Sequence, residues 1–153
     1  TNNRMALQSV IQAFTYLSAK GERLSVTFTT DSRYLVDGMT QWVHGWARKQ
    51  WRKADGKPVE NLSLWHQALS VVSAGGHEVE WRWVRGHAGH PQNEWANHLA
   101  TRAAADQTQS GGLVDSDFVS WMASLPAAVR KSGPPAVFPL SSTFAPARAL
   151  PAP

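Results

Sequence analysis

Two short stretches with alternating apolar side chains constrain the fold of this chain most. Residues 24–28 and residues 79–83 carry an apolar side chain at every second position, namely Leu24, Val26, Phe28, Val79, Trp81 and Trp83. Period two indicates a strand with one buried face. Helical spacing separates the two stretches, and strands separated by helices favour a parallel α/β layer. Two strands are too few for a stable sheet, so further strands are expected from outside residues 1–153, from another chain or from the tail.

Apolar side chains at helical spacing predict the helices around these strands. The first helix is expected in residues 4–20, with Asn2 or Asn3 as its cap and Gly21 at its end. Ser32 is expected to cap a short helix, and a second helical stretch is expected in residues 40–49. Two later helices are indicated by the apolar sets Trp65, Leu69 and Val72, and Trp95, Leu99 and Ala103.

The composition changes along the chain and predicts three parts. Seven of the nine prolines lie at or after Pro126. We expect a folded domain in residues 1–106, a linker with room for one short helix in residues 107–125, and a Pro/Ala-rich extension in residues 126–153 that contacts protein neighbours. The net charge of +4 and the pI near 9.9 favour a polyanionic partner. The absence of cysteine excludes disulfides, and no apolar stretch is long enough to suggest a membrane partner.

Five sequence blocks, in order, resemble signature segments of type 1 (bacterial) ribonuclease H. They read TNNRM from residue 1, TDSRY from residue 30, QWVHGW from residue 41, KPVEN from residue 57 and WVRGHAGHP from residue 83. The resemblance implies an α/β fold, with a mixed sheet and helices on both faces, whose first three strands are absent from this chain and whose C-terminal extension is mostly irregular. It also implies an activity, the Mg²⁺-dependent cleavage of RNA in RNA–DNA hybrids.

The same resemblance assigns the catalytic positions. Asp31 matches a metal-binding carboxylate, and His87 matches a histidine that the family uses for proton transfer or product release. Ala6 and Asn97 stand where the family has Glu and Asp. Two Mg²⁺ ions about 4 Å apart need a cluster of carboxylates. We therefore expect Asp31 and His87 to be vestigial, Asp31 to be a weak metal ligand, and no cofactor to be bound.

A basic and aromatic segment follows residue 41 and is typical of a nucleic-acid surface. Asn2 and Asn3 match residues that the family uses in the minor groove of the hybrid, with helix capping as the alternative. The expected nucleic-acid-binding set is Asn2, Asn3, Arg33, Trp42, Trp46, Arg48, Lys49, Trp51, Arg52, Lys53 and Lys57. Trp42 and Trp46 are expected to pack mainly between helices. Four other tryptophans are assigned to the core: Trp65, Trp81, Trp83 and Trp95.

Three functional hypotheses follow. The first is a catalytically inactive ribonuclease H-like protein that binds RNA or RNA–DNA hybrid as a structural subunit of a large ribonucleoprotein, such as a mitochondrial ribosome. It implies a mitochondrial location, with the cytoplasm otherwise. The alternative is an active ribonuclease H whose sequence here is mutated or incomplete. A third is a split protein whose missing strands come from a separate chain. Drift at Trp95 and His98, beside Asn97, favours natural over engineered loss of the carboxylates.

Overall fold

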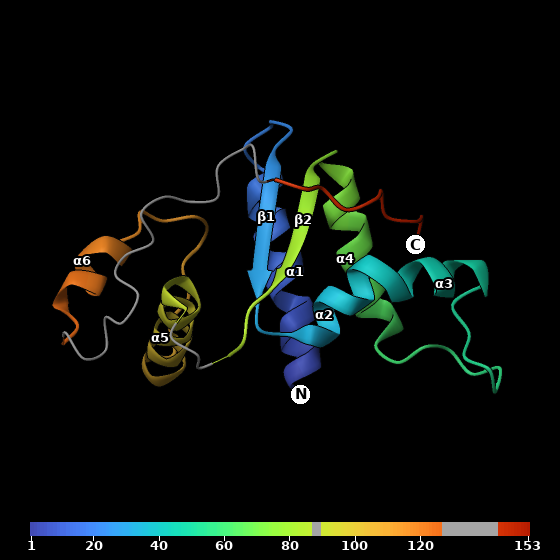
Figure 1. The fold of residues 1–153 in the computed structure, drawn as a ribbon, viewed down its shortest axis with the longest axis horizontal. Coiled ribbons are helices and arrows are strands. Elements are labelled where there is room, and N and C mark those ends of the chain that lie inside the picture. The colour runs from blue at the N-terminus through green and yellow to red at the C-terminus, as the bar shows by residue number, and fades with distance from the viewer. Residues whose placement is uncertain (87–89, 127–143) are drawn as a thin grey trace. The chain divides into compact units, whose positions relative to one another are not determined.

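The structure is a computed structural model that describes residues 1–86, 90–126 and 144–153. The chain divides into two compact units, Thr1–Trp83 with Ala145–Pro153, and Val84–Phe144. In chain order the elements are α1 (Asn2–Ser18), β1 (Ser25–Thr30), α2 (Arg33–Asp37), η1 (Gly38–Trp42), α3 (Val43–Arg48), α4 (Leu62–Ala74), β2 (Glu78–Trp83), α5 (Pro91–Asp106) and α6 (Phe118–Ser124) (Figure 1). This is the predicted order of helices and strands. Within the described ranges, no helix is both long and apolar enough to cross a membrane.

The two predicted strands form a parallel pair, as the helical segments between them indicated. Val26 pairs with Val79 and Phe28 with Trp81, so the apolar residues of both strands lie in register. The rings of Phe28 and Trp81 lie 5.4 Å apart between centroids, which is the type of cross-strand contact that stabilises a sheet. The described residues thus form a two-stranded sheet.

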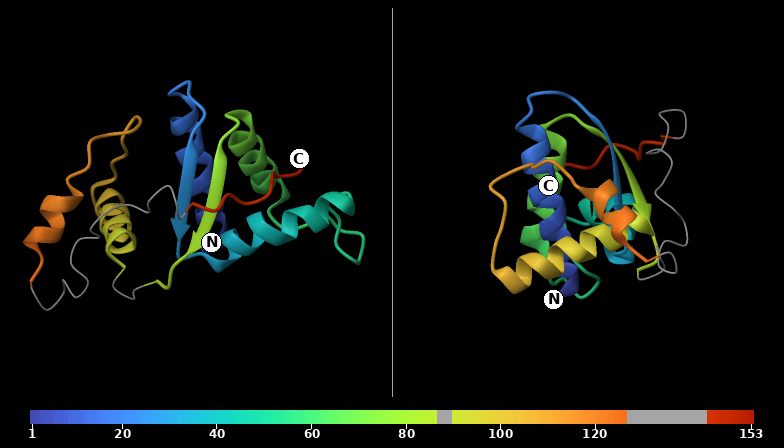
Figure 2. Two further views of the ribbon diagram at one scale, coloured as in Figure 1. Left: turned by 45° about the horizontal axis from the view of Figure 1, so that its top comes forward. Right: turned by 90° about the vertical axis from the view of Figure 1, so that its left-hand side faces the viewer.

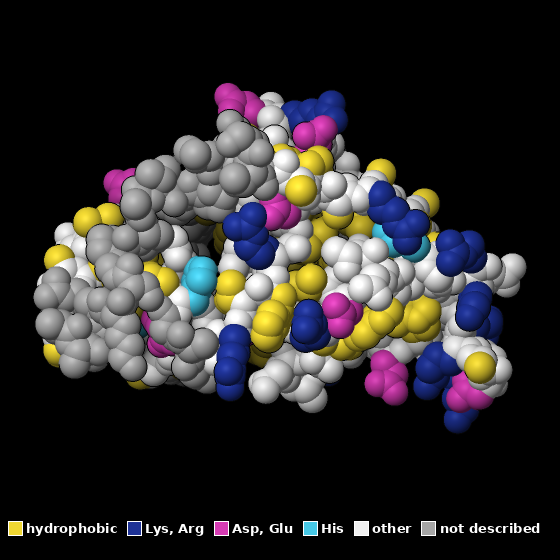
Figure 3. Space-filling model, viewed as in Figure 1, with side chains coloured by type: hydrophobic (Ala, Val, Ile, Leu, Met, Phe, Trp, Pro, Cys, Tyr) yellow, Lys and Arg dark blue, Asp and Glu magenta, His cyan; other side chains and the backbone are white. Residues whose placement is uncertain are grey.

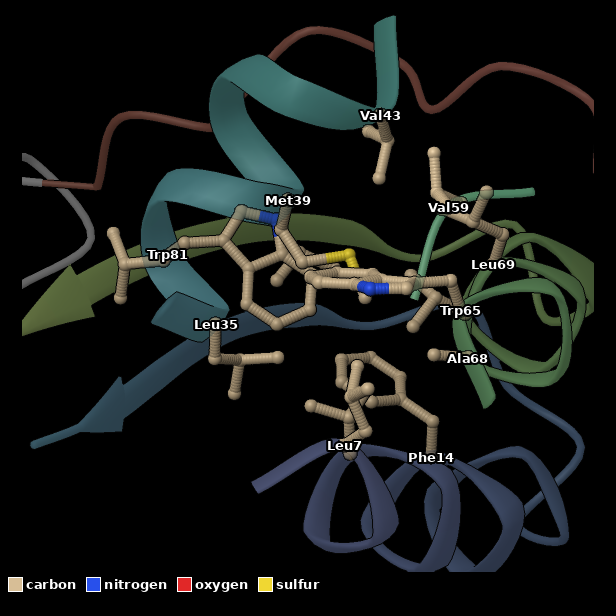
Figure 4. Packing of buried hydrophobic residues seen from close by; sticks show 14 of the residues in the cluster. Leu7, Phe14, Leu35, Met39, Val43, Val59, Trp65, Ala68, Leu69 and Trp81 are labelled. Atoms are coloured by element: carbon tan, nitrogen blue, oxygen red, sulfur yellow. The ribbon is translucent and has the colours of Figure 1, made fainter. Parts of the chain in front are cut away.

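Helices α1 and α4 lie side by side on one face of this sheet (Figure 2). Leu7 and Phe14 of α1 and Trp65 of α4 are fully buried, because they belong to stripes of apolar residues at helical spacing that face the sheet. Figure 4 shows the Trp65 ring at the centre of this packing, with Met39 on one side and Leu7 and Phe14 on the other. The helical spacing therefore predicted the main core correctly.

The cap of α1 differs from the prediction. The helix already includes Asn2 and Asn3, and Thr1 occupies the N-cap position, with no side-chain capping bond in the described structure. The main-chain N–H of Met5 donates to the carbonyl oxygen of Thr1 at 3.1 Å. The prediction that Asn2 or Asn3 caps the helix was wrong, because both residues already lie inside the helix and the N-cap position falls on Thr1.

The segment from Arg33 to Arg48 is a continuous helical run rather than two helices. Ser32 caps it as predicted, since its hydroxyl oxygen accepts a hydrogen bond from the N–H of Leu35 at 3.1 Å. Between α2 and α3, the residues of η1 form a π-helical turn. Gly38, at the start of this turn, lies so close to the Trp65 ring that a side chain would overlap it. The local helical signal did not reveal that the two segments join.

Residues Ala145–Pro153 lie against β2 of the same chain. The N–H of Ala147 donates to the carbonyl oxygen of Val79 at 2.8 Å, and the N–H of Ala145 donates to the Glu80 carboxylate at 2.9 Å. Ala147 and Leu150 also pack on the core. Part of the Pro/Ala-rich extension therefore contacts its own domain, and protein neighbours for the extension stay a prediction.

The second unit is built on α5 and α6. His90 caps α5 by accepting the N–H of Asn93 at 3.3 Å, and Pro91 follows at the first helical position, where its missing N–H costs nothing. Four aromatic rings, from Trp95, His98, Phe118 and Trp121, pack together between the two helices. Trp95 is half-buried in this small cluster rather than in a large core.

Candidate active site and nucleic-acid interface

The carboxyl ends of the two parallel strands bring the candidate residues Asp31 and Arg33 together with Trp83. Asp31 follows β1 directly and is exposed. The indole N–H of Trp83, the last residue of β2, donates to the main-chain carbonyl oxygen of Asp31 at 3.1 Å. The guanidinium carbon of Arg33 lies 4.4 Å from the centre of the Trp83 ring, within the range of a cation–π interaction. An acidic and a basic side chain therefore share one edge of the sheet.

The described residues do not fit a two-metal centre. Ala6 presents only a methyl group from α1, where the resemblance implies a carboxylate. No group of three or more His, Asp or Glu side chains that could hold a metal ion occurs in the part of the chain that the structure describes. Mg²⁺ requires oxygen ligands, and amides and methyl groups are poor substitutes for carboxylates. Asp31 alone is thus an incomplete donor set.

The structure does not place the two other predicted site residues, Asn97 and His87, relative to Asp31. Asn97 is exposed on α5 and belongs to the second unit. His87 lies outside the described residues. Their predicted roles stay predictions.

The predicted basic segment is exposed around the end of α3 and the following loop. Figure 3 shows Lys and Arg side chains gathered at this end of the molecule. The exposed members are Arg48, Lys49, Arg52, Lys53 and Lys57. The loop is held by its own backbone: Lys53 N–H donates to the Lys57 carbonyl at 2.7 Å, and an isolated bridge pairs Arg52 with Pro58. The resulting positive surface suits a phosphate backbone.

The tryptophans of this segment serve different purposes. Trp42 remains 37% exposed, whereas Trp46 packs between it and Trp65, with ring centroids 5.9 and 5.4 Å away. Trp51 is only 8% exposed and meets the His66 ring edge-on at 4.7 Å. The prediction that Trp51 contacts nucleic acid is therefore corrected, because a buried ring offers no free face for stacking. Its left-handed backbone, with φ of 59°, turns the side chain inward.

Asn2 and Asn3 are exposed in the first turn of α1. In the part of the chain that the structure describes, neither residue caps the helix, and the resemblance implies that both contact the minor groove. This role stays a prediction.

The sequence reasoning missed the role of Trp83. Trp65 and Trp81 are buried as predicted, but Trp83 is 38% exposed and contacts Asp31 and Arg33. The available signal was its place at the end of a strand, next to a polar loop. In parallel sheets such strand ends are where ligands bind.

Two titratable groups elsewhere in the first unit have shifted pKa values. Burial, reinforced by the positive charges of Arg148 and Arg48, lowers the pKa of His44. The hydrogen bond from the Ala145 N–H lowers the pKa of Glu80, with a further contribution from Arg82, which also forms an ion pair with it. Both shifts depend partly on residues 145–153.

The comparisons with known proteins agree on one family. The RNase H family model matches residues 1–105. The ribonuclease H of Verminephrobacter eiseniae (strain EF01-2) is 46% identical over 117 residues, which cover 76% of this chain and 74% of that protein. That of Paracoccus denitrificans (strain Pd 1222) is 50% identical over 105 residues, 69% of this chain and 64% of that protein.

A solved structure agrees with these relatives. The crystal structure of LC9-RNase H1, described as a type 1 RNase H with the type 2 active-site motif, shares 58% identity and a TM-score of 0.88. The match covers 99% of this chain and 70% of that one. It confirms the mixed α/β, ribonuclease H-like fold class.

These findings overturn the first functional hypothesis. Relatives between 46% and 50% identical are ribonucleases H, which contradicts an inactive subunit of a mitochondrial ribosome and supports the alternative, a hybrid-cleaving enzyme. The family normally uses Mg²⁺ and acts on RNA–DNA hybrids. The chain belongs to the ribonuclease H family.

Proposed function

We propose that this protein is a ribonuclease H that cleaves the RNA strand of RNA–DNA hybrids with the help of Mg²⁺. The observation that carries the proposal is the exposed Asp31 at the carboxyl end of β1, beside the Arg33 side chain on Trp83. This edge combines a hard oxygen donor with a cation, in a domain whose solved relative is a type 1 RNase H.

The chain's own residues supply binding and positioning. The exposed basic side chains at the end of α3 neutralise phosphates and fix the position of a duplex without reading its sequence. Asn2 and Asn3 offer amide donors and acceptors to the minor groove, where the 2′-hydroxyl distinguishes RNA from DNA. Asp31 supplies a carboxylate at the strand end. Asp31 would be one ligand of a Mg²⁺ ion, which would supply Lewis-acid chemistry, and the described residues do not complete its ligands.

The incomplete donor set makes the proposal testable by restoration. Cleavage by this sequence is expected to be slow, and Ala6→Glu with Asn97→Asp is expected to increase it, because each change adds a carboxylate oxygen donor. The assay follows a labelled RNA–DNA hybrid in Mg²⁺ and in EDTA, with single-stranded RNA and double-stranded DNA as controls. The same proteins are also assayed with the N-terminal strands that the resemblance implies, supplied from the Verminephrobacter eiseniae relative.

Asp31→Asn provides the matched control in each background. Mg²⁺-dependent cleavage of the hybrid that disappears in Asp31→Asn supports the proposal. If every restored protein leaves the hybrid intact, or cleaves it equally well without Asp31, the proposal is wrong.

A further inference from the structure

Trp83 makes two contacts that converge on the candidate site. Its indole N–H donates to the Asp31 carbonyl oxygen at 3.1 Å, and its ring face lies 4.4 Å from the Arg33 guanidinium carbon. Core tryptophans such as Trp65 are fully buried, but Trp83 is 38% exposed. The side chain therefore does more than fill the interior.

The hydrogen bond replaces a contact that the sheet cannot provide. Thr30 and Trp83 are the last residue pair of the parallel ladder, so Asp31 lies just beyond the strand-to-strand bonding. A main-chain carbonyl needs a partner or water, and the indole N–H supplies that partner. It thereby ties the backbone of Asp31 to the end of β2.

The ring face restrains a cation next to that carboxylate. A free arginine side chain loses considerable conformational entropy when it binds a phosphate. Stacking on an aromatic ring orders the planar guanidinium in advance and leaves its N–H groups free to donate. Arg33 is exposed, so a phosphate can approach it from solvent.

We infer that Trp83 is a positioning residue that fixes both the Asp31 backbone and the Arg33 cation, so that Arg33 contacts a phosphate of the bound hybrid beside Asp31. The inference rests on the proposed function and deepens it. The Trp83 N–H then fixes the position of the Asp31 carboxylate through its backbone, and the Trp83 ring orients Arg33 for binding the hybrid.

The first test examines the geometry alone, by NMR of the full chain. The indole resonance of Trp83 is assigned by its disappearance in Trp83→Phe. Arg33→Gln is expected to shift this resonance, whereas Arg23→Gln, at the other end of the sheet, is expected to leave it unchanged. An indole resonance that is insensitive to Arg33→Gln overturns the inference.

The second test measures binding of a fluorescein-labelled RNA–DNA hybrid in EDTA by anisotropy. Arg33→Gln is expected to weaken binding several-fold and to reduce the salt slope by about 0.9, the value for a single neutralised phosphate. Trp83→Leu is expected to weaken binding similarly, and the double variant no more than Arg33→Gln alone, because both changes remove the same interaction. Arg23→Gln is the charge-matched control.

The third test separates the two contacts by kinetics. Trp83→Phe keeps a ring face but loses the N–H, so it is expected to lower kcat with little change in KM, while Arg33→Gln mainly raises KM. The inference is overturned if the binding losses of Trp83→Leu and Arg33→Gln are fully additive. It is also overturned if Trp83→Phe has the same kcat as the wild type. In both cases the proposed function stands. A wild-type chain that does not bind the hybrid overturns the inference, while the restoration assay still decides the proposed function.

Discussion

Gly38→Ala should destabilise the protein even though alanine is the better helix former. Gly38 is buried at the start of η1, where the helix passes the Trp65 ring. A Cβ atom at this position would overlap Trp65 Cη2 and lie 2.8 Å from Cζ2 and 2.9 Å from Cζ3. These atoms belong to a rigid and fully buried ring, whose indole N–H donates to the Tyr34 hydroxyl at 3.0 Å. The ring therefore cannot move aside without disturbing its neighbours.

The magnitude follows from two opposing terms. Replacing glycine by alanine in a helix interior stabilises by roughly 0.5–1 kcal/mol. Overpacking a tight core costs about 1–3 kcal/mol, and overlap with three atoms of one ring places Gly38→Ala toward the upper end of that range. The net loss in the free energy of unfolding is therefore about 1–2 kcal/mol.

Gly45→Ala is the matched control, since Gly45 lies in α3 and an added Cβ there meets nothing within 4 Å. Gly45→Ala should gain only the stabilisation of alanine over glycine in a helix, so the free energies of unfolding of the two variants should differ by about 2–3 kcal/mol. Urea unfolding followed by circular dichroism measures this difference, with unchanged m-values as the sign of an unaltered native state. Adding Trp65→Phe to Gly38→Ala should recover part of the loss. Equal stability of Gly38→Ala and Gly45→Ala would refute the close packing of Gly38 on Trp65.

Three further predictions concern charge. The pKa of His44 is lowered in the folded state, so as the pH falls the unfolded chain binds a proton at His44 before the folded chain does. The free energy of unfolding should therefore decrease below about pH 6.5 and level off below the folded-state pKa. His44→Gln should remove this decrease in a pH series of urea titrations. The pKa of Glu80 is lowered in the folded state. The ionised carboxylate therefore stabilises the fold at pH values above the ordinary pKa of a glutamate, and this stabilisation is lost as the pH falls through the folded-state pKa. Glu80→Gln should therefore increase hydrogen exchange in Ala145–Pro153 at neutral pH, and unchanged exchange would argue against this anchor. Lys49→Gln with Lys53→Gln should reduce the salt slope of hybrid binding by about 0.9 for each phosphate that is no longer neutralised, whereas an unchanged slope would exclude these side chains from the interface.

Local spacing and short motifs were sufficient to predict the elements, the core and the family. The alternation around Val26 and Val79 predicted two strands, the helical spacing between them predicted their parallel pairing, and the stripes of α1 and α4 predicted the core. Five short blocks identified the family, which the comparisons confirmed. Periodicity carries this information because the spacing of apolar residues directly reports which face of an element is buried.

How residues distant in the sequence meet became visible only in the folded chain. Trp51 is buried because a left-handed loop turns it toward His66, and Trp83 is half exposed because it ends its strand beside Asp31. Residues 145–153 lie along β2, although their composition predicted only an extension. An alternating pattern cannot distinguish a core tryptophan from one at the end of a strand, because that difference depends on which other segments cover the ring, and folding is what brings those segments together.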